Sequence, residues 1–202
     1  MELEAFKQVF HATSASGGSY YETSTDTSLR ALVRTYGGKV YNYGLYRVLD
    51  APSIDFYTRL VRDAFLELAE GAEAFGMDWQ GNIFGLRIQP SRKVLLFQIG
   101  SGEAFEVSDS IKHFHNSELV EHPEESLNAN LWYQWFESNK RPLAWTECVG
   151  YKKPLFLGGQ YQLENLEIVD PRIYWELIGQ LLTQVRQLPP GTPVTHIRIE
   201  PT

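Results

Sequence analysis

The chain has 202 residues, of which 43% are hydrophobic and 13% aromatic, so it can build a well-packed domain and is not mainly disordered. No apolar run approaches the ~20 residues of a membrane span, and the start MELEAFKQVF lacks the basic leader and apolar core of a secretory signal. Cys148 is the only cysteine, which excludes an internal disulfide. These features predict a cytoplasmic protein.

The formal net charge of −7 is concentrated in one part of the chain. Residues 101–170 hold 12 acidic and 5 basic side chains, whereas the charges of the rest nearly cancel. An acidic surface repels nucleic acid and attracts basic partners. The alternative is a solvated face that only keeps the protein soluble.

The N-terminal region predicts an arm ahead of the main body. Leu3, Phe6, Val9 and Phe10 fall on one side of a short helix, and residues 13–28 are rich in Ser, Thr and Gly, which is typical of a link. We therefore expect a short helix and link over residues 1–28, followed by a single domain over residues 29–202.

The first half of that domain alternates helical and extended patterns. Residues 29–49 begin as a short helix, turn at Gly37-Gly38 and continue as a Tyr-rich extended run. An amphipathic helix follows, from Asp50 to near Gly71. A hairpin over residues 75–88 and strands over 93–99 and 104–107 then predict an antiparallel meander.

The second half is mostly helical. Residues 109–120 are helical or irregular, 124–139 have the spacing of one helix, 164–170 read as a strand, and 194–199 as a closing strand. Asp170-Pro171 is a strong helix start, and that helix should reach about Leu188. Together these elements predict an α+β fold, with one central antiparallel sheet and helices packed on one side.

Three motifs near the C-terminus carry a family resemblance. CVGYKKPLFLGG (148–159), ENLE (164–167) and the segment from Asp170 to Tyr174-Trp175 resemble the C-terminal signature of immunity proteins that neutralise type VI secreted DNase effectors. In many relatives this domain follows a GAD-like region. GMDWQGNIFGL (76–86), VLLFQIGSGE (94–103) and HFHNSELVE (113–121) extend the resemblance to roughly residues 40–188.

The resemblance implies a SUKH-like fold and an immunity protein that binds a cognate toxin, with no catalysis and no cofactor. Its signature residues are expected to be structural, because a surface specific to one toxin should vary. They are Cys148, Gly150, Tyr151, Pro154, Gly158, Gly159, Glu164, Asn165, Glu167, Asp170, Tyr174 and Trp175.

Acidic side chains of the middle region are the candidates for contact with the toxin, since a DNase needs basic residues to hold phosphate. They are Glu103, Glu106, Glu118, Glu121, Glu124 and Glu125. Asp78 and Trp79, at the hairpin tip, could add an aromatic anchor. The alternative is that Trp79 packs inward and Asp78 shapes the turn.

Two other functions stay open from the sequence. A metal-dependent enzyme could use His113, His115 and the neighbouring Glu118, Glu121 and His122, but the two histidines share a face only on a strand. A general protein-interaction module is the other. Cys148 lacks the signature of a catalytic cysteine, and neither Gly158-Gly159 nor Gly100–Gly102 has a phosphate-loop pattern.

Overall fold

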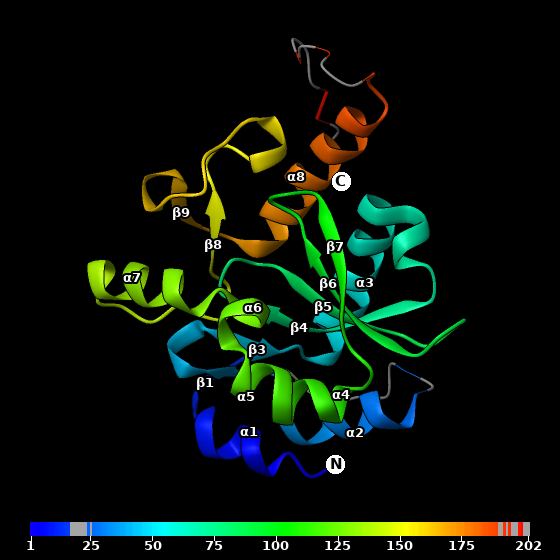
Figure 1. Cartoon of the computed structure of the whole chain (residues 1–202), viewed down its shortest axis with the longest axis vertical. Coiled ribbons are helices and arrows are strands. Elements are labelled where there is room, and N and C mark those ends of the chain that lie inside the picture. Colours follow the sequence, from blue (N-terminus) through cyan, green and yellow to red (C-terminus); the bar gives the residue numbers. More distant parts are fainter. Residues whose placement is uncertain (17–23, 25, 190–191, 193, 195–197, 200–202) are drawn as a thin grey trace.

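The computed structural model describes residues 1–16, 24, 26–189, 192, 194 and 198–199. Its centre is a seven-stranded sheet in which every strand is antiparallel to the next one along the chain (Figure 1). The strands are β1 (Ala12–Ala15), β2 (Lys39–Tyr41), β3 (Tyr46–Val48), β4 (Ala72–Asp78), β5 (Ile83–Arg87), β6 (Lys93–Gln98) and β7 (Glu103–Ser108). The predicted α+β class with an antiparallel meander is confirmed.

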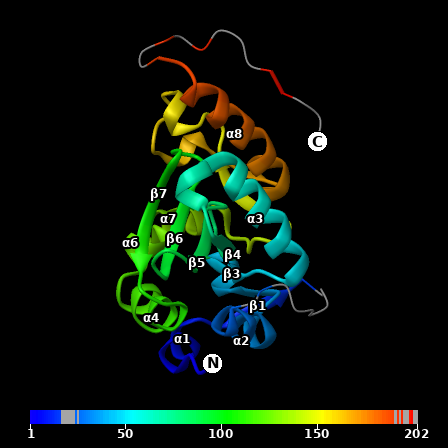
Figure 2. The same ribbon diagram turned by 90° about the vertical axis from the view of Figure 1, so that its right-hand side faces the viewer.

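Two long helices lie together on one face of this sheet, α3 (Ala51–Phe65) and α8 (Pro171–Arg186). Phe65 of α3 packs on Phe97 of β6, with ring centroids 5.2 Å apart, and on Trp175 of α8 at 6.2 Å. Figure 2 shows α8 alongside α3. Both helices begin where the sequence predicts, because Asp50 and Asp170 accept hydrogen bonds from the amides of their first turns.

The other face of the sheet is covered near β4 and β5 by a short helical segment. It runs through α4 (Ile111–His113), a π-helical turn (Phe114–Glu118) and α5 (Leu119–Glu121). Phe114 packs on Phe84 of β5, with ring centroids 4.7 Å apart. The residue before Phe84, Ile83, pairs with Phe97 of β6, the residue on which α3 packs. Because neighbours along a strand point to opposite faces, this segment and α3 lie on opposite sides of the sheet.

The first residues of the chain are joined to this body. Phe6 of α1 (Glu4–Val9) is fully buried, with its ring 5.2 Å from that of His115. Residues 13–15 of the expected link belong, with Ala12, to the edge strand β1, and all four side chains are exposed. A strand whose side chains are all exposed carries no apolar alternation, so the sequence pattern did not reveal it. Residues 17–23 and 25 of the expected link lie outside the described residues.

The helix expected over residues 124–139 is two helices, α6 (Pro123–Leu127) and α7 (Ala129–Asn139). Asn128 separates them in the left-handed conformation, with φ 53° and ψ 48°. The remaining helix, α2 (Thr27–Tyr36), precedes β2.

Two further strands, β8 (Cys148–Tyr151) and β9 (Leu166–Val169), form a separate antiparallel pair. Residues 195–197 of the expected closing strand lie outside the described residues. No helix within the described part of the chain is long and apolar enough to cross a membrane.

Candidate functional site

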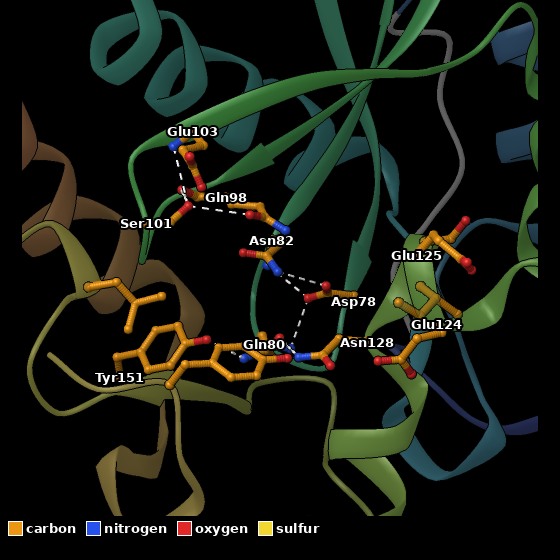
Figure 3. Close-up of a pocket in the computed structure, with 14 residues that line it drawn as sticks. Asp78, Gln80, Asn82, Gln98, Ser101, Glu103, Glu124, Glu125, Asn128 and Tyr151 are labelled. Atoms are coloured by element: carbon orange, nitrogen blue, oxygen red, sulfur yellow. Dashed lines mark hydrogen bonds between the residues drawn. The ribbon is translucent and has the colours of Figure 1, made fainter.

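A cavity of about 310 Å³ opens where the main sheet meets the C-terminal part of the chain (Figure 3). Its walls come from the β4–β5 turn, the β6–β7 turn, α6 and the segment that follows β8. The lining residues are Asp78, Gln80, Asn82, Gln98, Ser101, Glu103, Glu124, Glu125, Ser126, Leu127, Asn128, Tyr151, Leu155 and Tyr161. Four of these are carboxylates and none is basic, so the cavity has an acidic character and suits a cationic group.

Asp78 organises the turn at the base of the cavity. Its Oδ1 accepts hydrogen bonds from the backbone amides of Gln80 and Asn82, at 2.8 and 2.9 Å, and its Oδ2 accepts one from the Asn82 side chain at 2.8 Å. Burial raises the pKa of Asp78 to about 7, although the hydrogen bonds from Asn82 and Gln80 act in the opposite direction. Asp78 therefore changes charge near neutral pH.

A chain of side-chain hydrogen bonds ties the three walls together. Nδ2 of the Asn128 side chain donates to Gln80 Oε1 at 2.9 Å, and Gln80 Nε2 donates to the Tyr151 hydroxyl at 3.1 Å. These residues come from the α6–α7 junction, the β4–β5 turn and β8. Their bonds fix the relative positions of the walls, so the cavity is largely preformed.

Trp79 does not lie on the surface. Its side chain is fully buried, its Nε1 donates to the Leu127 carbonyl at 2.8 Å, and its ring lies 5.5 Å from that of Trp132. The α6–α7 region covers the hairpin tip. The expectation that Asp78 and Trp79 form an exposed anchor is therefore wrong as to exposure, since Asp78 is only 1% exposed. The structure has the alternative arrangement, in which Trp79 packs inward and Asp78 shapes the turn.

Three of the six candidate glutamates gather at the cavity. Figure 3 shows Glu103 on one side of it and Glu124 with Glu125 on another, with Asp78 and Asn82 between them. Glu124 also accepts a hydrogen bond from the Asn130 amide at 2.7 Å, which leaves Glu103 and Glu125 the freer pair.

The other three candidate glutamates lie elsewhere. Glu106 forms an ion pair with Arg87, and Glu118 lies 3.1 Å from Nδ1 of His113. Glu121 is exposed at the end of α5. The six side chains therefore do not make one continuous acidic patch.

The two histidines of the HxH motif lie in different environments. His115 is buried, with Nδ1 2.7 Å from the Ile111 carbonyl and Nε2 3.0 Å from the Tyr46 hydroxyl, and burial lowers its pKa to about 4. His113 is exposed. On this helical segment the two rings point apart, because residues two positions apart on a helix face different directions. No cluster of three or more potential His, Cys, Asp or Glu ligands occurs among the described residues.

Several signature residues pack α8 against β8. The Tyr174 hydroxyl accepts a hydrogen bond from the Tyr151 amide at 3.1 Å, and Trp175 Nε1 donates to the Gly81 carbonyl at 2.6 Å. A Cβ on Gly150 would stand 2.7 Å from the Tyr174 ring, so only glycine allows this approach. These contacts hold the C-terminal segment against the turn that forms the cavity base.

Other signature residues shape the loop between β8 and β9. The Asn165 side chain accepts from the Lys153 amide at 3.0 Å and donates to the Lys153 carbonyl at 2.9 Å. Gly158 has a φ of 80°, and Gly159 lies so close to the Lys153 carbonyl that a Cβ would not fit. The Pro154 carbonyl accepts from the Gly159 amide at 3.0 Å.

The last three signature residues differ in their surroundings. The Cys148 thiol is buried, and burial raises its pKa, so it is unreactive at neutral pH. The side chains of Glu164 and Glu167 are exposed. Nothing in the structure explains their place in the signature.

The fold and the cavity thus define an α+β protein with a preformed acidic cavity at the junction of its two sheets. Residues 108–182 match the family model described as "T6SS immunity protein Tdi1, C-terminal". This segment is similar to the C-terminal domain of type VI secretion immunity proteins, which confirms the resemblance seen in the sequence.

The overall fold is similar to that of a solved protein, "Crystal structure of Atu4351 from Agrobacterium tumefaciens". The TM-score is 0.62 at 14% sequence identity, with 89% of each chain covered. At this identity the likeness establishes the fold alone. No curated protein matches the chain.

Proposed function

We propose that this protein is an immunity protein that binds a cognate secreted DNase and inhibits it by covering its basic DNA-binding surface. The observation that carries the proposal is the acidic cavity, because the family-matched segment supplies one side of it, from Glu124 to Asn128 together with Tyr151, Leu155 and Tyr161. The β4–β5 and β6–β7 turns supply the other side.

The cavity has the chemistry to accept a basic side chain of the toxin. Its volume of about 310 Å³ is enough for one lysine or arginine side chain, with Glu103 and Glu125 at the entrance and amide oxygens deeper inside. A DNase groups basic residues to hold phosphates, so a partner that engages one of them also blocks the DNA. The immunity protein would act by binding, without catalysis, in the compartment where the toxin meets DNA.

Complementary charge would also speed encounter. Residues 101–170 carry most of the net negative charge of the chain, and this field would steer a basic toxin toward the cavity. A fast association protects the cell before the nuclease reaches its substrate.

The experiment combines the purified protein with the nuclease encoded beside its gene and measures binding and cleavage of plasmid DNA. We compare a Glu103→Gln/Glu125→Gln variant with a Glu121→Gln/Glu167→Gln variant, which removes the same charge from exposed sites outside the cavity. The cavity variant should bind at least about tenfold more weakly, as expected for buried charge-assisted contacts, and inhibit less. The control variant should behave like the unchanged protein.

Two results would contradict the proposal in different ways. Failure of the unchanged protein to bind or inhibit the neighbouring nuclease would exclude the immunity role toward it. Equal binding by the two variants would leave that role standing and remove the cavity as the contact site.

A further inference from the structure

A second cavity, of about 240 Å³, lies beneath β3, between the first turns of α3 and α8 and residues 145–146. Its polar lining comes from Arg47, Ser53, Tyr57, Thr146, Asp170 and Arg172. It shares no lining residue with the acidic cavity. Its two arginines, Arg47 and Arg172, give this cavity a basic character, whereas the first cavity is acidic.

Arg47 is a buried cation without an anionic partner. Its side chain is 1% exposed, and its Nη1 and Nη2 donate to the carbonyls of Trp145 and Glu147, both at 2.6 Å. Its Nε has no hydrogen-bond partner. Within the described residues, none of the ion pairs includes Arg47.

The nearest buried carboxylate does not compensate this charge directly. Asp78 pairs with Tyr46 across β3 and β4, whereas Arg47 pairs with Met77. Paired residues share a face of the sheet and adjacent residues alternate, so Asp78 and Arg47 leave the sheet on opposite sides. A buried charge whose hydrogen bonds go only to neutral carbonyls is costly, and an anion in contact with it would be strongly stabilised.

Two helix N-termini border the same cavity, and each is capped by an aspartate, Asp50 for α3 and Asp170 for α8. Ser53 belongs to the first turn of α3, and Pro171 and Arg172 are the first two residues of α8, helices of 15 and 16 residues. Arg172 brings a second guanidinium, stacked 4.8 Å above the Phe56 ring. Asp170 is the one carboxylate of the lining, and it accepts from the amides of Arg172 and Ile173 as the cap of α8.

We propose that this cavity binds a small organic carboxylate, with Arg47 as its main ligand. The unpartnered Nε and the planar guanidinium match a carboxylate group. Leu49, Met77 and the Trp145 ring supply apolar walls for a short carbon body, and the Tyr57 hydroxyl adds a polar group. This inference is independent of the immunity role, because it uses a different cavity.

The test is a nitrogen-edited NMR titration of the full chain with propionate, benzoate and inorganic phosphate, at constant ionic strength set with chloride. The Nε–H resonance of Arg47 reports directly on the proposed contact. We compare the unchanged protein with Arg47→Met, and with Arg141→Met as control, because Arg141 is an exposed partner of Glu147 in the same loop. Propionate or benzoate should shift the Arg47 signal saturably, and the affinity should fall at least tenfold in Arg47→Met and stay unchanged in Arg141→Met.

Arg172→Gln keeps the test decisive if Arg47→Met fails to fold, since Arg172 is exposed and its removal should weaken carboxylate binding several-fold. The absence of saturable binding by all three anions would overturn the proposal, as would equal affinity in every variant. Tighter binding of phosphate than of either carboxylate would overturn the assignment of the ligand class. If Arg47 served only to hold residues 145–147 against the sheet, one of these contradicting outcomes would be observed.

Discussion

Two buried side chains, Asp78 and His115, have pKa values displaced toward their neutral forms. Burial raises the pKa of Asp78 to about 7 and lowers the pKa of His115 to about 4, because a charge in the interior loses its hydration. The two displacements act on the free energy of unfolding with opposite signs over an overlapping range of pH, and single substitutions can separate them.

For Asp78, the folded state holds the proton up to about pH 7, whereas the unfolded chain releases it near its ordinary pKa of 3.8. Between these values the folded state binds more protons, so the free energy of unfolding should decrease as pH rises, by on the order of 2–4 kcal/mol. Asp78→Asn should remove that decrease. Urea unfolding from pH 4 to 8 measures it, with Glu121→Gln as an exposed control that keeps the decrease. An unchanged slope in Asp78→Asn would contradict the displaced pKa.

His115 should give the opposite trend. The unfolded chain takes up a proton near pH 6.5, whereas the folded state resists protonation down to about pH 4. Stability is therefore fully present above pH 6.5 and decreases as pH falls through this window, by on the order of 2–3 kcal/mol. His115→Gln should flatten the acid limb of the same unfolding series. His113→Gln, two residues away and exposed, should retain it, and identical profiles for the two variants would refute the assignment.

The sequence could predict the local chemistry of single residues but not what covers them. The Asp78-x-Gln80-x-Asn82 pattern allows a side-chain-capped turn, and Cys148 reads as a buried thiol. The burial of Trp79 depends on α6 and α7, nearly fifty residues later in the chain. Gln80 and Tyr151 lie in segments that carry the family resemblance, but no pattern in the sequence brings them together with Asn128 in one cavity. The signal that could have pointed to these residues was their polarity next to apolar strands.

At the scale of elements, the starts of helices with a strong cap were predicted almost to the residue, whereas α3 ends at Phe65 and not near Gly71. Asp50 and Asp170 mark the starts of α3 and α8 because a side-chain acceptor and an early proline are local features. The break at Asn128 was missed because Leu127, Leu131 and Trp135 keep a spacing of four across it. Apolar periodicity reports the buried side, and a change of helix direction need not interrupt it.

The break can be tested with two substitutions at one position. Asn128 has a positive φ, which glycine tolerates and alanine does not, so Asn128→Gly should be more stable than Asn128→Ala by about 1 kcal/mol. Both variants lose the bond to Gln80, so the comparison isolates the backbone. Guanidinium unfolding at neutral pH measures the difference. Alanine as the more stable variant, again by about 1 kcal/mol, would instead indicate a continuous helix.

At the scale of the whole molecule, the charge distribution should govern how fast the proposed toxin binds. The association rate should fall by roughly an order of magnitude between ~0.05 and ~0.5 M salt, because screening removes electrostatic steering. The Glu103→Gln/Glu125→Gln variant should show a shallower dependence. Stopped-flow mixing with the neighbouring nuclease measures both, and a rate that does not change with salt would exclude steering by the acidic region.

The meander has a consequence for the order in which the protein matures. All seven strands of the main sheet end by Ser108, where the family-matched segment begins, and each strand pairs with its neighbour along the chain. The strands of a chain leaving the ribosome can therefore pair in order while residues 109–189 are still being made. The acidic cavity has walls from both halves of the chain, so the proposed toxin-binding site would be complete only near the end of translation.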